Sequence, residues 1–322
     1  MKNLFNRRKF LQTAAVTTSA ALLPSIEGCV SGSGNGKHGV ITGELPKRRL
    51  GRTNKMVSCI GFGAGSRYCN WVAEDPGAHQ KYIDYAIKLG ITYFDSARAY
   101  GNGVAEERYG LYLTPKYRKQ IFLNAKTNQR TYDGVMKEVE ISLKTMKTDY
   151  FDLYCMHGIY TMDEVNTLTG PNGGYKAFLK LKNEGVAKFI GFSFHVWGEA
   201  IKKAFNEFDI DAVLCPINAA RYTGCEDNVV TLAQQRDIGL IAIKILGQNS
   251  LIGNVTGDDL VRWALRLPVS VANIGMDGYS PLESCVNIGK EPLISEAEAR
   301  EIEIKLNFDP KVTRLPYYTA KN

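Results

Sequence analysis

The stretch Phe94-Asp95-Ser96-Ala97-Arg98-Ala99-Tyr100-Gly101 ends an apolar run with an acid and places a tyrosine five residues after that acid. The apolar residues 91–94 predict a short strand that ends at Asp95, and residues 104–113 predict a helix after a glycine-containing loop. This order of strand, loop and helix puts polar side chains at the C-terminal end of a strand. On its own, the stretch is equally consistent with a capping Asp95 and a packed, structural Tyr100, so the rest of the chain has to decide.

The same alternation of strand and helix continues along most of the chain. Strand-like runs cover 59–64, 91–94, 120–125, 150–156, 188–194, 212–217, 240–246 and 271–274. Helical patterns cover 77–89, 104–113, 133–146, 175–183, 199–208, 228–236, 258–267 and 281–286. Eight strands that alternate with eight helices over roughly 250 residues are typical of a (β/α)8 barrel.

A doubly wound parallel sheet is the alternative fold. That fold carries a glycine-rich fingerprint after its first strand, and Gly61-Phe62-Gly63-Ala64-Gly65 has the wrong spacing with no helix directly behind it. Residues 48–58 contain the turn Gly51-Arg52-Thr53-Asn54 between two extended pieces. We therefore expect an α/β protein, a (β/α)8 TIM barrel with an N-terminal β-hairpin.

The composition is that of a globular protein with a large core. The chain has 322 residues, of which 44% are hydrophobic and 23% are charged. Its formal net charge of +7 includes no basic tract, which argues against a nucleic-acid partner. Apart from Cys29, the cysteines form no Cys-x-x-Cys pair and no metal-type cluster, so no metal site is expected.

The amino terminus has the pattern of an export signal. Asn6-Arg7-Arg8-Lys9-Phe10-Leu11 is a twin-arginine pattern, and the apolar stretch behind it is too short to span a membrane stably. Ile26-Glu27-Gly28-Cys29 resembles a bacterial lipoprotein cleavage box, which implies a lipid anchor on Cys29; the alternative is export without a lipid. We expect a signal over 1–29, a flexible tether over 30–44 and the barrel over 45–322, in the periplasm or cell envelope.

Polar residues at the C-terminal ends of barrel strands point into one shared mouth. In this chain they are Asp95, Lys126 with Thr127, His157, Ser193 with His195, Asn218, Lys244 and Asp277. An ammonium within about 4–6 Å of a tyrosine favours the phenolate, and Lys126 is a candidate for that role beside Tyr100. Asp95 would keep Lys126 charged, and His157 would steer a carbonyl oxygen. Together they can polarise a carbonyl and move a proton while a hydride arrives from elsewhere.

These motifs resemble the aldo-keto reductases, a family of NAD(P)-dependent (β/α)8 oxidoreductases, over residues 50–287. The matching segments are Leu50 to Thr53, Gly90 to Ala97 with Tyr100, Gly101 and Glu106, Ala125 to Thr127, Asp149 to Tyr154 with His157, Glu184 with Gly185, and Ile190 to Ser193. The resemblance implies a catalytic tetrad of Asp95, Tyr100, Lys126 and His157. It also implies a small-molecule carbonyl or alcohol as substrate; the oligomeric state stays open.

The cofactor side matches the family less well. The resemblance implies that Ser193 binds the nicotinamide carboxamide, but the usual neighbouring asparagine is Phe194 and the usual glutamine is Leu214. Asn218 or backbone groups are expected to hold the carboxamide in their place. His195 and Lys244 resemble a subgroup of exported bacterial members.

Residues 274–287 resemble the family's adenosine-binding segment. The resemblance implies contacts from Gly275, Asp277 and Asn287. Acidic groups at Asp277 and Glu283 would repel a 2′-phosphate, so the sequence favours NAD over NADP. Lys244 would either contact a phosphate or an anionic substrate, or extend past the rim.

Export suggests that the protein folds around its dinucleotide, retains it, and acts on sugar-like substrates. Tyr68 and Trp71, in the loop after the first strand, are candidates for the substrate wall. Two other functions stay open: a cofactor-binding sensor with slow turnover, and an aldolase-type barrel in which Lys126 forms a Schiff base.

Overall fold

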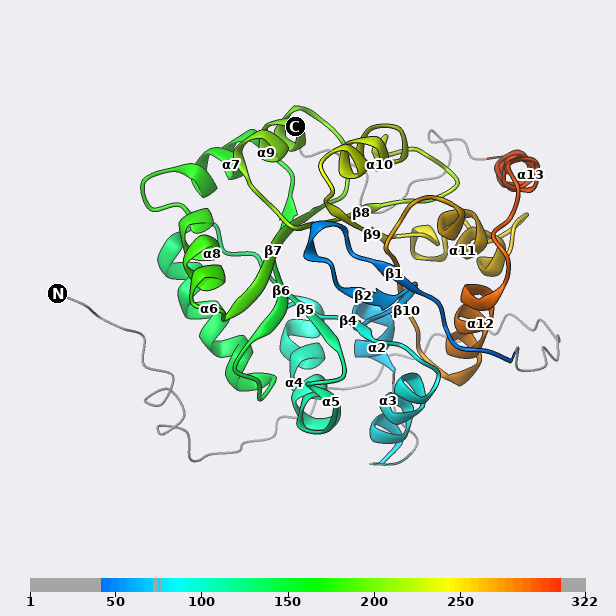
Figure 1. Cartoon of the computed structure of the whole chain (residues 1–322), viewed down its shortest axis with the longest axis horizontal. Coiled ribbons are helices and arrows are strands. Elements are labelled where there is room, and N and C mark those ends of the chain that lie inside the picture. The colour runs from blue at the N-terminus through cyan, green and yellow to red at the C-terminus, as the bar shows by residue number, and fades with distance from the viewer. Residues whose placement is uncertain (1–41, 72–74, 76, 308–322) are drawn as a thin grey trace. The chain divides into compact units, whose positions relative to one another are not determined.

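The computed structural model describes residues 42–71, 75 and 77–307 (Figure 1). The expected export signal over 1–29 and most of the expected tether lie outside the described residues. Within the described ranges, no helix combines the length and the apolar character that crossing a membrane requires.

Eight parallel strands close into a barrel in the order β10-β3-β4-β5-β6-β7-β8-β9 (Figure 1). They are β3 (Ile60–Gly63), β4 (Tyr93–Asp95), β5 (Phe122–Thr127), β6 (Phe151–Ile159), β7 (Ala187–Phe194), β8 (Ala212–Pro216), β9 (Gly239–Ile243) and β10 (Val271–Gly275). Every strand that the sequence predicts is present, with boundaries displaced by a few residues. The (β/α)8 prediction is confirmed.

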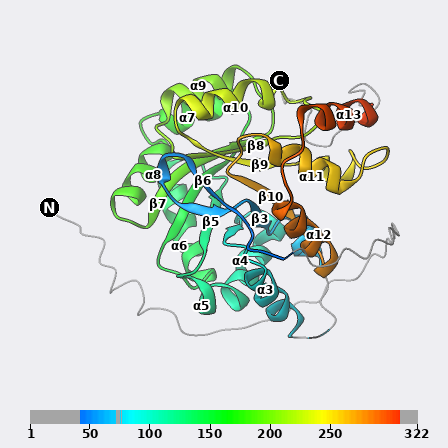
Figure 2. The same ribbon diagram turned by 45° about the vertical axis from the view of Figure 1, so that its right-hand side comes forward.

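Helices surround the strands on the outside of the barrel (Figures 1 and 2). The predicted ones are α3 (Ala78–Lys88), α4 (Val104–Tyr112), α6 (Tyr132–Thr145), α8 (Gly174–Asn183), α9 (Glu199–Glu207), α10 (Cys225–Gln235), α11 (Gly257–Arg266) and α12 (Tyr279–Lys290), and the tail adds α13 (Glu296–Leu306). The sequence did not predict α2 (Ser66–Asn70), α5 (Thr114–Tyr117) and α7 (Met162–Thr169).

A β-hairpin packs against the amino-terminal end of the barrel. Strands β1 (Lys47–Arg49) and β2 (Met56–Ser58) pair antiparallel across the 3-10 turn η1 (Gly51–Thr53). Leu50 and Val57 are buried in the core inside the barrel, which confirms the predicted hairpin. At Gly51 the backbone is left-handed (φ 47°), and a Cβ there would collide with the backbone at Gly239, so only glycine fits.

The alternation of side chains along the strands separates an apolar layer from a polar layer. The apolar core inside the barrel includes Tyr93, Phe122 and Leu153. On the same strands and in the same period-two register, Asp95, Lys126 and His157 follow at positions further toward the C-terminal ends. The polar residues therefore stand above the core at the mouth of the barrel.

Candidate active site

A cavity of about 730 Å³ lies at the C-terminal ends of the strands. Its volume is within the range of about 300–1,000 Å³ that is usual for ligand pockets. Its lining includes residues that the sequence predicts to be functional, among them Asp95, Tyr100, Lys126, His157, Ser193, Lys244 and Gly275. The barrel thus brings together side chains that are widely separated in the sequence.

An ion pair between Asp95 and Lys126 forms the floor of this cavity. The Lys126 Nζ donates to Asp95 Oδ1 at 2.5 Å and to the Ser96 carbonyl at 2.7 Å. Asn124 Nδ2 donates to the same Asp95 oxygen at 2.7 Å. Both charged side chains are almost completely buried. An unpaired buried charge is costly, and here the two opposite charges are paired with each other.

Tyr100 begins the 3-10 turn η2 (Tyr100–Gly103) and lies above this ion pair. Its hydroxyl is 3.4 Å from Asp95 Oδ2, and the Lys126 Nζ is 4.7 Å from the centre of its ring. Burial and the Asp95 carboxylate raise the pKa of Tyr100 well above its ordinary value. Burial and the carboxylate thus outweigh the neighbouring ammonium of Lys126, and the hydroxyl keeps its proton. That Lys126 favours the phenolate stays a prediction.

His157 stands next to Tyr100, with ring centres 5.6 Å apart and the rings nearly perpendicular. Burial, followed by the positive charge of Lys126, lowers the pKa of His157 to about 2. The imidazole is therefore neutral at physiological pH and can donate a hydrogen bond through one ring nitrogen. Its Nδ1 is buried and has no hydrogen-bond partner among the described residues.

The opposite side of the cavity carries further basic groups. Burial, then Lys244 and Lys126, lowers the pKa of His195 to about 3, and its Nδ1 is 2.9 Å from the Tyr160 hydroxyl. Burial, then Lys126, lowers the pKa of Lys244 to about 8. Ser193 Oγ accepts a hydrogen bond from the Gly158 amide at 2.9 Å, which leaves its hydroxyl proton for a ligand.

Comparison with known proteins decides the family. The model of the Aldo/keto reductase family matches residues 59–303. The chain belongs to the aldo/keto reductase family. All four positions that the resemblance assigns to the tetrad lie inside this match and on the cavity wall.

Individual relatives of this aldo/keto reductase are distant. "Uncharacterized oxidoreductase YqkF" of Bacillus subtilis is 32% identical over 161 residues, which are 46% of this chain and 49% of that protein. "Aldo-keto reductase yakc [NADP(+)]" of Schizosaccharomyces pombe is 26% identical over 67% of this chain and 65% of its own length. The chain thus spans about half to two thirds of these two curated relatives.

Solved structures show the same fold. An aldo-keto reductase from Bacillus halodurans in its holo form has a TM-score of 0.65 and 23% identity, covering 82% of this chain and 96% of its own. An aldo/keto reductase from Klebsiella pneumoniae in complex with NADP and acetate has a TM-score of 0.65 and 20% identity, covering 81% of this chain and 95% of its own.

The cavity of this aldo/keto reductase fits a dinucleotide. One wall is bare backbone at Gly63, Gly65 and Gly275, so a flat or extended ligand can approach the main chain closely. At Gly63 a Cβ would lie only 3.1 Å from the Ile274 carbonyl oxygen, so the strand itself favours glycine there. Lys244 also lies on the cavity wall.

Three predicted cofactor ligands do not line the cavity. Asn218 is buried, its Oδ1 accepts from the Ala220 amide at 3.1 Å, and its Nδ2 is 3.4 Å from the Lys244 carbonyl, so its side chain supports the loop after β8. Asn287 lies half-buried in α12. Asp277 lies between β10 and α12, outside the lining residues.

The structure weakens the charge argument for NAD over NADP at Asp277. Asp277 forms an ion pair with Arg67 at 2.8 Å, and Glu283 accepts a hydrogen bond from the Tyr85 hydroxyl at 2.6 Å. A carboxylate that is already paired with a guanidinium repels a phosphate much less than a bare one does.

The expected substrate wall differs in detail. Tyr68 is fully buried and packs edge-on against Phe62, so the prediction that it faces a substrate is wrong. Trp71 packs against His79 and Tyr82 instead of lining the cavity. Helix α2 still contributes to the wall, through Ser66, Arg67, Cys69 and Asn70.

Sequence reasoning missed Asn124, which fixes the orientation of the Asp95 carboxylate from below. The signal was available, because Asn124 precedes Lys126 by two residues and must share its face of the strand. It also missed Tyr160, which follows β6 and contacts His195. No pattern in the sequence distinguishes that loop tyrosine from the others.

Proposed function

We propose that this protein is an oxidoreductase that interconverts a carbonyl and an alcohol with a nicotinamide dinucleotide. The observation that carries the proposal is a tyrosine and a histidine side by side in one cavity, over a buried lysine–aspartate pair. The dinucleotide, when bound, supplies or accepts the hydride. The protein's side chains hydrogen-bond the carbonyl oxygen and transfer its proton.

In the direction of reduction, Tyr100 is the proton donor. Its pKa is raised, so the hydroxyl is protonated when a carbonyl arrives, and it can donate to the oxygen that becomes negative. His157, held neutral, can offer a second hydrogen bond to the same oxygen. Lys126, next to the Tyr100 ring, stabilises the phenolate that forms once the proton has left.

The Schiff-base alternative has no support in this geometry. An aldolase-type lysine needs a neutral amine with a free path to the substrate carbonyl. The Lys126 Nζ donates two short hydrogen bonds, to Asp95 and to Ser96, and is almost completely buried. The nitrogen is therefore engaged as a hydrogen-bond donor and has no free path to a substrate carbonyl.

Residues that would hold the dinucleotide are Ser193, through its free hydroxyl proton, and Lys244, through charge. The glycine wall at Gly63 and Gly275 would admit the extended part of the molecule. Leu214, which lines the cavity, offers no hydrogen bond to a carboxamide. We propose that either NAD or NADP is accepted.

The finer proposal is a polar, sugar-like substrate and a dinucleotide that stays bound through export. The cavity rim supports a polar substrate, because Asn70, Gln248 and Asn249 line it. The twin-arginine pattern, with or without a lipid on Cys29, supports export of a folded protein into the periplasm or cell envelope.

Purified full-length protein tests this proposal. We expect the absorbance of a nicotinamide and the mass of NAD or NADP in the denatured supernatant, and a change in that absorbance when keto-sugars or sugars are added. Protein that carries no nucleotide and exchanges NAD and NADP rapidly would contradict retention. A bound nucleotide that no carbonyl or alcohol oxidises or reduces would contradict the enzyme and favour the sensor.

A further inference from the structure

The C-terminal end of β6, which carries His157, is irregular. The pairing of β6 with β7 shifts register between Met156 and Ile159. Gly158 has a left-handed backbone (φ 63°). Such a bulge redirects the side chain beside it, and it takes the local carbonyls out of the regular hydrogen-bond ladder. The direction of the His157 imidazole therefore depends on whatever holds the bulge.

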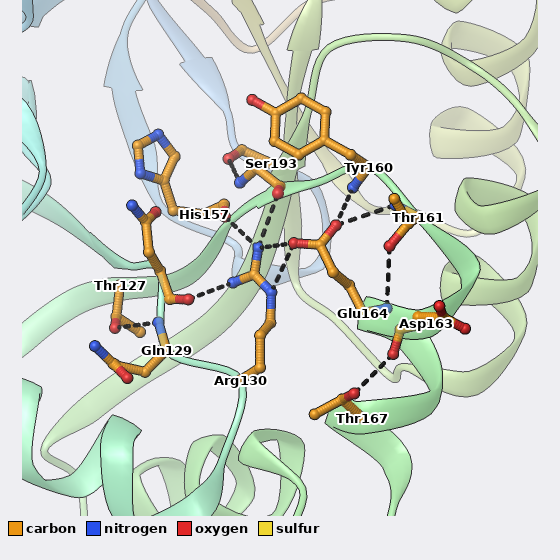
Figure 3. A network of polar contacts seen from close by, with 12 residues as sticks. Thr127, Gln129, Arg130, His157, Tyr160, Thr161, Asp163, Glu164, Thr167 and Ser193 are labelled. Carbon is orange, nitrogen blue, oxygen red and sulfur yellow. Dashed lines mark hydrogen bonds and ion pairs between the residues drawn. The ribbon is translucent and has the colours of Figure 1, made fainter. Parts of the chain in front are cut away.

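Arg130, from the loop between β5 and α6, holds this bulge. Its Nη2 lies 2.8 Å from the His157 carbonyl oxygen and 2.8 Å from the Gly158 carbonyl oxygen (Figure 3). From the other side, the Gly158 amide donates to Ser193 Oγ. The bulge is thus fixed to neighbours on both sides.

Glu164 fixes Arg130 in turn. Its Oε1 accepts from Arg130 Nη2 at 2.9 Å and from Nε at 3.2 Å, and its Oε2 accepts from the Tyr160 and Thr161 amides at 2.7 and 3.0 Å (Figure 3). The exposed fraction of the Arg130 side chain is 15%. This partly buried, multiply bonded pair is stronger and better defined than an exposed ion pair.

We propose that Arg130, oriented by Glu164, is a positioning residue that directs the His157 imidazole toward Tyr100. The proposal rests on the function proposed above, because it assigns a role to His157 in that reaction. Arg130 itself does not line the cavity, so it acts through the histidine. Its charge adds to burial, Lys126, His195 and Lys244 in lowering the pKa of His157.

The chain offers a matched control at the other end of the same strand. Arg118 donates to the Tyr150 carbonyl at 3.0 Å and pairs with Asp152 at 2.8 Å, with 10% of its side chain exposed. Its contacts resemble those of Arg130 in kind and burial, but they lie at the end of β6 away from the cavity. Arg118→Gln therefore removes similar structural support without touching His157.

Turnover gives the first readout. We expect Arg130→Gln to lower kcat by on the order of 10²-fold, the cost of a misplaced catalytic group, with dinucleotide affinity unchanged. Arg130→Ala should recover rate when guanidinium ion is added, because the ion can occupy the vacated space. Glu164→Gln, a milder change, should lower kcat less. Arg118→Gln should keep the wild-type kcat; an equal loss in both arginine variants would overturn the proposal.

Nitrogen NMR of the imidazoles gives a readout that needs no activity. The chain has only four histidines, so the His157 signal can be assigned with a His157→Gln variant. We expect that signal to move, and its titration to shift to higher pH, in Arg130→Gln and not in Arg118→Gln. An unchanged His157 signal would refute the positioning role. If the wild type turned over no carbonyl or alcohol while Arg130→Gln still moved the His157 signal, the proposed function would be refuted and the positioning role would stand.

Discussion

Asp95 is the residue on which the charge balance of the site depends. It accepts from Lys126 and Asn124 through one oxygen and lies near the Tyr100 hydroxyl through the other. Because the carboxylate is buried, its negative charge both stabilises the ammonium and opposes formation of the phenolate. A single side chain thus pairs with the lysine and adds to the effect of burial in raising the pKa of the tyrosine.

A double-mutant cycle measures this coupling. Lys126→Met removes the ion-pair partner of the buried Asp95, and we expect it to destabilise the fold by about 3–5 kcal/mol. Asp95→Asn leaves the ammonium unpaired and should be costly for the same reason. The double variant should be more stable than the sum of the two losses predicts, as measured by urea unfolding. Additive losses would mean that the pair is not coupled.

At the residue scale, the sequence predicted which side chains share the mouth but not their protonation. Asp95, Lys126 and His157 could be found because parallel strands end on one side of a barrel and side chains alternate along them. The state of Tyr100 depends on how deeply the loop buries it, which no spacing encodes. The same rule predicted Asn218, which follows the end of β8. Its side-chain amide instead hydrogen-bonds the backbone of Ala220 and of Lys244.

At the scale of elements, a buried carboxyl joins the loop after β8 to helix α10. Glu226 is almost completely buried, and its Oε1 accepts from the Asn218 amide at 2.7 Å. Burial raises the pKa of Glu226 from 4.5 to about 7. The folded protein therefore favours the protonated form, and this contribution to stability is present below pH 4.5 and is lost as the pH rises to about 7.

The substitution Glu226→Gln tests this contact through the pH dependence of the free energy of unfolding. A rise of this size corresponds to on the order of 3 kcal/mol in the free energy of unfolding. We expect the stability of the variant relative to the wild type to increase by about this amount between acidic and neutral pH. Denaturant unfolding of both proteins across that range measures their free energies of unfolding. The difference between the two cancels the contributions of the other titrating groups. A difference that stays constant with pH would show that Glu226 is not buried in its protonated form.

Elements were predictable where their pattern is long. The eight main helices show a repeated apolar spacing, and the eight strands show as apolar runs that alternate with them. The short α2 and α5 have too few residues for that. Helix α7 could have been found, because Thr161 and Glu164 form a capping box whose spacing is visible in the sequence.

At the scale of the whole molecule, the residues that stabilise the barrel and the residues of the candidate site lie at different ends of it. The hairpin and the apolar core close one end, and the cavity with its polar residues opens at the other. This division explains why the fold class followed from the alternation alone, whereas the choice between NAD and NADP did not. The charge argument for that choice counted carboxylates alone, whereas the pairing of Arg67 with Asp277 forms only in the folded chain.

The central claim is that Tyr100 passes a proton to a carbonyl oxygen while hydride is transferred. A single-turnover experiment on protein loaded with reduced dinucleotide tests it most directly, by the rate at which the reduced nicotinamide absorbance is lost after a carbonyl substrate is added. Tyr100→Phe should slow that rate by about 10²-fold or more, with the affinity for the dinucleotide unchanged. Equal rates in the wild type and in Tyr100→Phe would contradict the claim.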